Sequence, residues 1–234
     1  LILVALYGSG ILLVRELTLK WQKGWGSILL LGLAYGIIEE GLVVMSFFDP
    51  AWKDLGILAT YGRWLGVNWV WAFWLTIFHP VYSISLPLLL FNLLFPQLKS
   101  QRLLSDKGLN GCFIVLLALT GLGYLGFFTP YRPFWFLYLA TFLIVVGLFV
   151  AAWKVKTEIG APQNPKPRLG PIWFGVVGFA FSFLLMAVNT ELPSLVALPL
   201  IPIVCGLLLG FLVLLFLSKY LGYTQNTNHQ FALA

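Results

Sequence analysis

The chain has 234 residues, of which 60% are apolar and 9% are charged, and its formal net charge is +6. An ordinary soluble domain is about one quarter charged, and an aqueous surface needs polar cover that this composition does not supply. The composition therefore excludes an ordinary soluble protein and predicts an integral membrane protein, because lipid accepts an apolar exterior.

Seven apolar segments follow one another along the chain, separated by polar or proline-containing stretches. Helices satisfy their own backbone hydrogen bonds inside lipid, so the segments predict an all-α polytopic transmembrane bundle of about seven spans, forming one domain over residues 1–234. The first segment is shorter than the roughly 20 residues that a span requires, so either a few upstream residues complete it or its start is missing. The expected spans are Leu1–Val14, Gly26–Phe48, Val67–Phe95, Gly111–Phe128, Phe134–Trp153, Ile172–Val188 and Leu195–Leu217.

The Lys and Arg residues divide unequally between the two sides of this predicted bundle. Loops that alternate along the chain face opposite sides, and one set contains only Lys53, Arg63 and Arg132. The other set holds the remaining eleven of the fourteen basic residues: Arg15, Lys20, Lys23, Lys99, Arg102, Lys107, Lys154, Lys156, Lys166, Arg168 and Lys219. Cytoplasmic loops are enriched in Lys and Arg, so we expect the N-terminus outside and the C-terminus in the cytoplasm.

This distribution also bears on localisation and partners. It indicates a multi-pass protein of a cell membrane, of the bacterial inner-membrane type. The positive charge is explained by topology, so no nucleic-acid partner is expected beside the lipid bilayer.

Two connecting stretches have a distinctive composition. The segment Pro50–Gly66 is too polar to span a bilayer and too apolar to stay free in water, so we expect it to lie on the outer interface. The segment Lys154–Pro171 contains four prolines, which favour an extended loop. Cys112 and Cys205 lie inside apolar runs without a CxxC motif, so no structural metal site and no cofactor are expected.

Three ionisable residues fall deep inside predicted spans, namely Glu39, Glu40 and His79. Such residues are expensive in lipid and are functional candidates by default. Glu39 is ten residues before Asp49, or about 15 Å from the outer edge, and His79 is twelve residues after Val67, or about 18 Å from the same edge. The two spans are antiparallel neighbours along the chain, so the imidazole and at least one carboxylate are predicted to meet.

Helical spacing separates the two glutamates. Gly32, Gly36 and Glu40 share a stripe of small residues that favours close helix approach, so Glu40 is expected to face a neighbouring backbone. Glu39 belongs to a second, more polar stripe. Together with Glu40, the residues predicted to bind a substrate or ion are Tyr35, Glu39, Ser46, Thr76, His79 and Ser83.

Two prolines interrupt the third span, Pro80 and Pro87. Each frees the carbonyl group four residues earlier, at Thr76 and Ser83, and both carbonyls fall on the predicted polar face. Transporters form substrate sites at interrupted helices of this kind.

The residues Tyr35–Gly41 and Phe48–Pro50, together with His79 and Ser83–Pro87, resemble an uncharacterised family of bacterial polytopic membrane proteins. The resemblance covers about the first hundred residues. It implies a membrane bundle and brings no established activity.

The Glu39–Glu40 pair and His79 also show a partial likeness to glutamate-dependent intramembrane proteases of the CAAX-processing type. That likeness implies that Glu39 or Glu40 activates a water molecule and that His79 assists as a general acid or base. The sequence departs from the protease pattern, because Val44 stands where Arg is expected and Leu75 where Phe is expected, and no second intramembrane histidine exists.

Three functions remain open from the sequence, and whether the protein is an enzyme is one of the open points. The preferred one is a proton- or cation-linked transporter of a small solute. The second is an intramembrane hydrolase in which Glu39, Glu40 and His79 are catalytic. The third is a non-catalytic subunit of a membrane complex, acting with a partner subunit or as a homo-oligomer.

Overall fold

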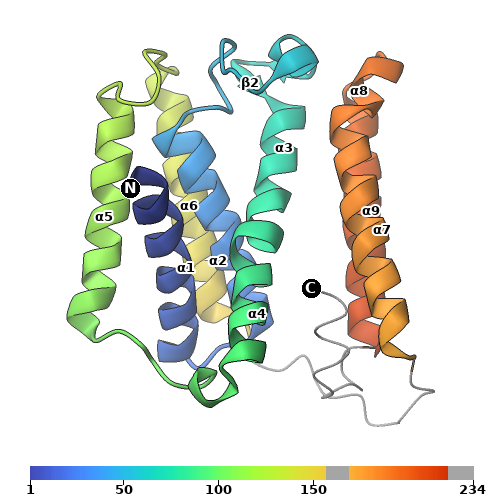
Figure 1. The fold of residues 1–234 in the computed structure, drawn as a ribbon. Coiled ribbons are helices and arrows are strands. Elements are labelled where there is room, and N and C mark those ends of the chain that lie inside the picture. Colours follow the sequence, from blue (N-terminus) through green and yellow to red (C-terminus); the bar gives the residue numbers. More distant parts are fainter. Residues whose placement is uncertain (157–168, 221–234) are drawn as a thin grey trace. The chain divides into compact units, whose positions relative to one another are not determined.

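The structure is a computed structural model that describes residues 1–156 and 169–220. Within these ranges, seven helical segments are long and apolar enough to cross a membrane (Figure 1). They are Ile2–Lys20, Trp25–Val43, Trp69–Leu94, Asp106–Tyr124, Trp135–Lys154, Pro171–Thr190 and Leu200–Tyr220. The predicted all-α polytopic bundle is therefore confirmed, whereas the orientation of its termini stays a prediction.

The chain divides into two compact units, Leu1–Thr157 and Glu158–Ala234. The first unit contains the helices α1 to α6 and the second contains α7 to α9. The single domain expected from the sequence stays a prediction, and each unit is described by itself below.

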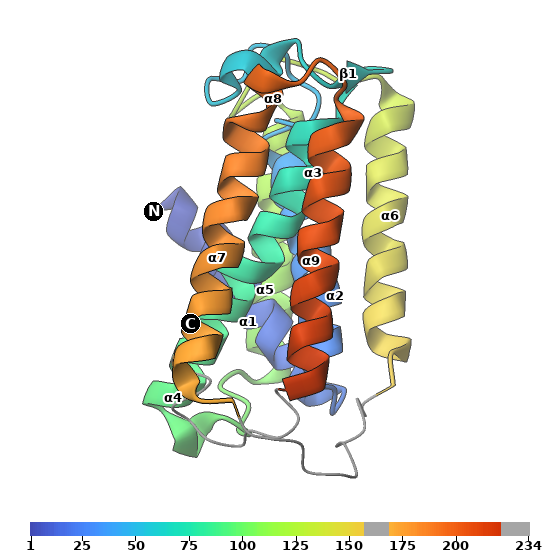
Figure 2. The same cartoon turned by 90° about the vertical axis from the view of Figure 1, so that its right-hand side faces the viewer.

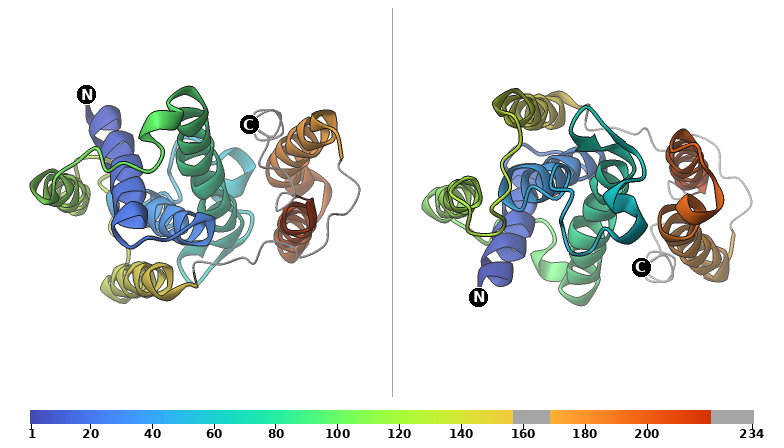
Figure 3. Two further views of the ribbon diagram at one scale, coloured as in Figure 1. Left: turned by 90° about the horizontal axis from the view of Figure 1, so that it is seen from below. Right: turned by 90° about the horizontal axis from the view of Figure 1, so that it is seen from above.

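Helix α2 is the central element of the first unit. It packs against α6 on one side and against the α3–η3–α4 segment on another, while α1 packs against α5. The end-on views show the same neighbours (Figure 3). The helices are α1 (Ile2–Lys20), α2 (Trp25–Ile37), the π-helical turn η1 (Ile38–Val43), α3 (Trp69–Phe78), the π-helical turn η3 (His79–Ser85), α4 (Leu86–Leu94), the short 3₁₀ turn η4 (Pro96–Leu98), α5 (Asp106–Tyr124) and α6 (Trp135–Lys154).

Apolar side chains from α1, α2 and α5 form the core of this unit. Leu6, Leu13, Leu31 and Leu116 are all buried there. Many large apolar residues of α6 are instead exposed, such as Leu143. An apolar exterior of this kind suits a protein surrounded by lipid.

The ends of the first two spans differ most from the expected ones, and the fourth span, Asp106–Tyr124, also lies several residues earlier than expected. Helix α1 continues to Lys20 instead of ending at Val14, because the charged groups of Arg15 and Glu16 are buried and paired inside the unit. The second span leaves helical structure after Val43 instead of Phe48.

The chain beyond Val43 is irregular but buried. Met45 has a positive φ of 57°, which ends the helix, and residues 45–49 remain buried. Irregular backbone at membrane depth persists only where protein or a wet cavity satisfies it. This segment is therefore an internal part of the unit, and it directly follows the two glutamates.

Residues 50–68 fold over one end of the first unit. They contain the turn η2 (Gly56–Ala59) and a small antiparallel hairpin of β1 (Arg63–Trp64) and β2 (Val67–Asn68), in which Arg63 pairs with Asn68 and Trp64 with Val67. Asp49 Oδ2 accepts a 2.5 Å hydrogen bond from Thr129 Oγ1, which ties this end to the α5–α6 connection.

The second unit is a helical hairpin. Helices α7 (Pro171–Thr190) and α9 (Leu200–Tyr220) pack against each other and are joined through α8 (Leu192–Leu195) (Figure 2). Phe174, near the start of α7, lies 5.2 Å from Phe216, near the end of α9, between ring centroids, so the two helices run in opposite directions. The centre of the predicted loop Lys154–Pro171, including Lys166 and Arg168, lies outside the described residues.

Candidate functional site

The three ionisable residues singled out in the sequence all lie in π-helical turns. Glu39 and Glu40 belong to η1, and His79 is the first residue of η3. A π-helical turn inside a longer helix is rare and occurs frequently at functional sites. His79 is ten residues inside the Trp69–Leu94 segment, or about 15 Å along its axis, which places it near the middle of that span.

The side chains of these three residues are in direct contact. Nε2 of His79 lies 3.2 Å from Oε1 of Glu40, and Nδ1 of His79 lies 3.4 Å from Oε2 of Glu39. All three are buried, with His79 only 1% exposed. One ligand-type atom from each residue lies within 4.8 Å of the others, so the three form a single polar centre.

Glycines on α2 make this contact possible. A Cβ atom at Gly36 would stand 2.8 Å from Cβ of His79, and a Cβ atom at Gly32 would stand 2.7 Å from Cα of Pro80. The small-residue stripe thus allows α2 to approach η3 closely, as its spacing predicts. Glu40, which was expected to face a neighbouring backbone, instead reaches the imidazole of His79.

Further polar side chains orient the centre. The Ser46 hydroxyl donates a hydrogen bond to Oε2 of Glu40, and Nε1 of Trp71 donates to Oγ of Ser46 at 3.0 Å. On the opposite side of the imidazole, Oγ of Ser83 lies 3.0 Å from Nδ1 of His79. Glu40 and His79 are therefore both held by neighbours that fix their positions.

Glu39 is held less completely. Tyr7 and Tyr35 are its neighbours, and the ring of Tyr35 packs edge-on against His79 with 5.9 Å between centroids. Within the described residues, neither Oε2 of Glu39 nor the buried hydroxyl of Tyr35 has a hydrogen-bond partner. The centre thus contains buried polar atoms with unused capacity to bind.

The structure brings together six of the seven residues predicted to bind a substrate or ion. Thr76 is the exception: it is half-buried, and in the described part of the chain no hydrogen bond joins it to the central side chains. Two neighbours were missed. Trp71 precedes His79 by eight residues and so lies on a similar helix face, and Tyr7 is, like Ser9, a polar residue in the apolar run Leu1–Val14.

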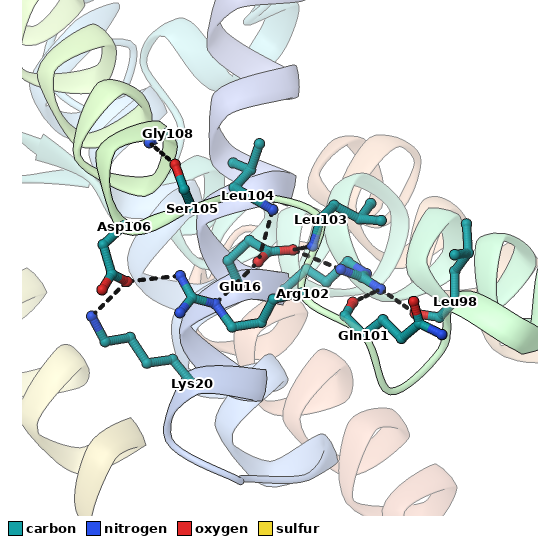
Figure 4. Close-up of polar contacts among 11 residues, drawn as sticks. Glu16, Lys20, Leu98, Gln101, Arg102, Leu103, Leu104, Ser105, Asp106 and Gly108 are labelled. Carbon is teal, nitrogen blue, oxygen red and sulfur yellow. Dashed lines mark hydrogen bonds and ion pairs between the residues drawn. The ribbon is translucent and has the colours of Figure 1, made fainter.

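A different buried carboxylate, Glu16 on α1, shows how this chain neutralises an acid for structural purposes (Figure 4). Glu16 is fully buried, and its carboxylate lies 2.6 Å from Nη1 of Arg15 and 3.4 Å from Nε of Arg102. The backbone N–H groups of Leu103 and Leu104 also donate to it. Every part of this carboxylate is matched by a cation or a donor.

Glu39 and Glu40 lack such cations. Among the described residues, no Lys or Arg side chain forms an ion pair with either of them, and His79 is the basic group that they share. Two carboxyl groups therefore share one imidazole in a buried position, with no second basic side chain beside them in the described part of the chain. This contrast with Glu16 separates a candidate binding site from a structural ion pair.

A groove of about 490 Å³ lies beside the centre, between α1 and the α3–η3–α4 segment. It reaches the centre through Ser83, which contacts His79, and through Tyr7, which neighbours Glu39. Its lining residues are Tyr7, Gly8, Ile11, Phe78, Tyr82, Ser83 and Pro87. A molecule in this groove would therefore lie against the residues that surround the carboxylates.

The fold and this centre together define a polytopic α-helical membrane protein with a buried Glu–Glu–His group. Residues 1–227 match the family described as "Uncharacterized membrane protein family", and the chain belongs to that family. No curated protein and no solved structure matches the chain. The predicted membership of an uncharacterised membrane family is thus confirmed, while nothing in these comparisons supports the likeness to CAAX-type proteases.

Proposed function

We propose that the protein is a cation-linked transporter of a small solute, in which Glu39, Glu40 and His79 bind the cation. The observation that carries this proposal is the pair of buried carboxylates that share one imidazole and have no Lys or Arg partner in the described structure. Uncompensated charge is strongly unfavourable in a buried site, so ionisation of both carboxyl groups requires an additional cation, and a proton or a metal ion can fill this role.

The end of the second span strengthens this preference. Glu39 and Glu40 lie in the last turn of the helical segment Trp25–Val43. The carbonyl groups at the C-terminal end of a helix carry partial negative charge, which attracts cations. Transporters place coupling ions at helix ends of this kind inside the membrane.

The groove supplies the place for a solute. Its volume of about 490 Å³ falls within the range of roughly 300–1,000 Å³ that is usual for small-molecule sites. Ser83 and Tyr7 line the groove and also neighbour the charged centre. Binding of a cation and of a solute would therefore affect the same side chains, which is the requirement for coupling.

The two other functions have less support. A hydrolase needs a water molecule between the base and its partner, whereas both imidazole nitrogens of His79 contact carboxylate oxygens directly. A purely structural subunit would not need a groove that reaches the residues around His79.

The proposal can be tested with the purified full-length chain in proteoliposomes on a solid-supported membrane. Concentration jumps of H⁺, Na⁺, Mn²⁺ or Zn²⁺ should produce a transient current with at least one of these ions. Glu39→Gln and Glu40→Gln should abolish that current. Glu191→Gln is the matched control and should retain it, because Glu191 is exposed in the second unit. Absence of current with all four ions would contradict the proposal.

A further inference from the structure

We infer that the cation bound by Glu39, Glu40 and His79 is a divalent transition-metal ion, of the class that includes Zn²⁺ and Mn²⁺. Only the claim that this ion is the coupling ion of transport rests on the proposed function. The metal site itself depends only on the geometry and chemistry of the three side chains.

The donor atoms are close enough for one ion. A carboxylate oxygen from each glutamate and one imidazole nitrogen lie within 4.8 Å of one another. Ligand atoms about 2.0–2.2 Å from a tetrahedral Zn²⁺ stand roughly 3.3–3.6 Å apart. One nitrogen of His79 can face a single ion, and Nε2 lies 3.2 Å from Oε1 of Glu40, which is close to this spacing. Glu39 contacts the other nitrogen, Nδ1, so its carboxylate has to rotate toward Nε2 to complete the site.

The unpartnered atoms of the centre point to a ligand independently of this spacing. Glu39 is 4% exposed, and its Oε2 atom has no hydrogen-bond partner among the described residues although it lies beside His79. A buried oxygen without a partner is costly. Coordination of an ion would satisfy it.

Charge and ligand type select the class of ion. Two carboxylates and a neutral imidazole balance a charge of +2, and a neutral complex is what a buried site favours. Imidazole suits Zn²⁺ and other transition ions, whereas Mg²⁺ and Ca²⁺ prefer oxygen ligands throughout. The mixed set of Glu39, Glu40 and His79 therefore favours a transition-metal ion over the alkaline-earth ions.

The surrounding hydrogen bonds resemble those that orient metal ligands. Ser46, itself held by Trp71, donates to the Glu40 carboxylate, and Ser83 engages one nitrogen of His79. Outer partners of this kind fix the ring and carboxylate orientation of a metal ligand. This inference departs from the sequence-based expectation of no metal, because that expectation depended on linear motifs and on cysteine spacing.

The direct test is metal binding by the purified full-length chain, stripped with a chelator and carrying no histidine tag. Titration with Co²⁺, followed by visible absorption, and with Zn²⁺, followed by calorimetry, should show one ion per chain. Mg²⁺ and Ca²⁺ should compete weakly. X-ray absorption of the Zn²⁺-loaded protein should show nitrogen and oxygen ligands that include one imidazole. This measurement uses the unaltered chain, so it remains informative if a variant fails to fold.

Variants then assign the ligands. Glu39→Gln, Glu40→Gln and His79→Gln should each weaken Zn²⁺ binding by at least about tenfold. Glu191→Gln is the matched control and should bind Zn²⁺ with unchanged affinity, because Glu191 is exposed in the second unit. Lack of stoichiometric binding, sulfur ligation, or binding that survives all three central substitutions would overturn the inference.

The two proposals fail in different ways. Stoichiometric metal binding without any ion-driven current would support the metal site and refute its use in transport. Current driven by H⁺ or Na⁺ from a protein that binds no Zn²⁺ or Co²⁺ would refute the metal site and support a transporter that uses another cation.

Discussion

Buried carboxylates occur in two electrostatic environments in this chain. Glu16 is surrounded by Arg15, Arg102 and two backbone donors, whereas Glu39 and Glu40 share His79. A buried ion pair whose members are fully hydrogen-bonded holds elements together. The Glu16 network joins α1 to the connection before α5, so its role is structural. Its loss should therefore lower the stability of the protein more than its ability to bind a ligand.

Glu16→Ala should strongly destabilise the first unit. The substitution leaves the buried guanidinium of Arg15 and the N–H groups of Leu103 and Leu104 without their acceptor. Breaking a buried pair by removing one partner typically costs about 3–5 kcal/mol. The measurement is thermal or denaturant unfolding of the purified protein in detergent micelles.

Asp106→Ala provides the control for this prediction. Asp106 pairs with Lys20 at 3.0 Å and with Arg102 at 2.9 Å, but its side chain is exposed. Exposed ion pairs contribute little because water and salt screen them, so unfolding should barely change. Equal unfolding curves for Glu16→Ala and the unaltered chain would show that the Glu16 network does not hold α1 to this connection.

The sequence predicted part of the centre at the level of single residues. Glu39, Glu40 and His79 stand out as ionisable residues inside apolar spans. Because the second and third spans run in opposite directions, the sequence also predicted that the imidazole would meet a carboxylate. The positions of Tyr7 and Thr76 were not predictable, because helical periodicity does not fix which helix face meets which neighbour. Arg15 and Glu16 looked like the start of a loop, since their burial depends on partners more than eighty residues away.

Irregular backbone elements position the centre formed by Glu39, Glu40 and His79. Two π-helical turns, η1 and η3, lie opposite each other, and the buried segment 45–49 follows η1. Each interrupts a helix that periodicity alone would continue. Pro80 indicated the interruption in the third span, but neither the π-turn at Ile38–Val43 nor the positive φ of Met45 has a signal in the sequence.

Gly36→Ala should disturb the contact between these elements. The added Cβ would stand 2.8 Å from Cβ of His79, in a region where both backbones are fixed by packing. Overpacking of this kind costs about 1–3 kcal/mol, and it should also displace His79 and lower Zn²⁺ affinity. Unfolding in detergent and calorimetry with Zn²⁺ measure the two effects.

Gly147→Ala is the matched control on α6, where an added Cβ meets nothing within 4 Å. Alanine is a better helix former than glycine by up to about 1 kcal/mol, so this variant should be as stable as the unaltered chain or slightly more stable. Should both alanine variants leave stability and Zn²⁺ affinity intact, the close approach of α2 to η3 would not be needed.

At the scale of the whole molecule, the described basic residues of the first unit are concentrated at one end. Arg15, Lys20 and Lys23 follow one another at the end of α1, and Arg102 lies in the connection before α5, where it shares Asp106 with Lys20. The opposite end carries the cap of residues 50–68, which includes Lys53 and Arg63. Because Lys and Arg are retained on the cytoplasmic side, this asymmetry predicts that the cap faces outward.

Single cysteines test this orientation in a Cys112→Ala, Cys205→Ala background. Thr60 is exposed in the cap, and Ser100 is exposed in the connection between α4 and α5. A membrane-impermeant maleimide added to intact cells should label Thr60→Cys, whereas Ser100→Cys should react only after the cells are opened. The reverse pattern would place the cap in the cytoplasm. It would also reverse the predicted orientation of the span that carries Glu39 and Glu40. Labelling of both positions in intact cells would contradict the placement of the two ends on opposite sides of a membrane.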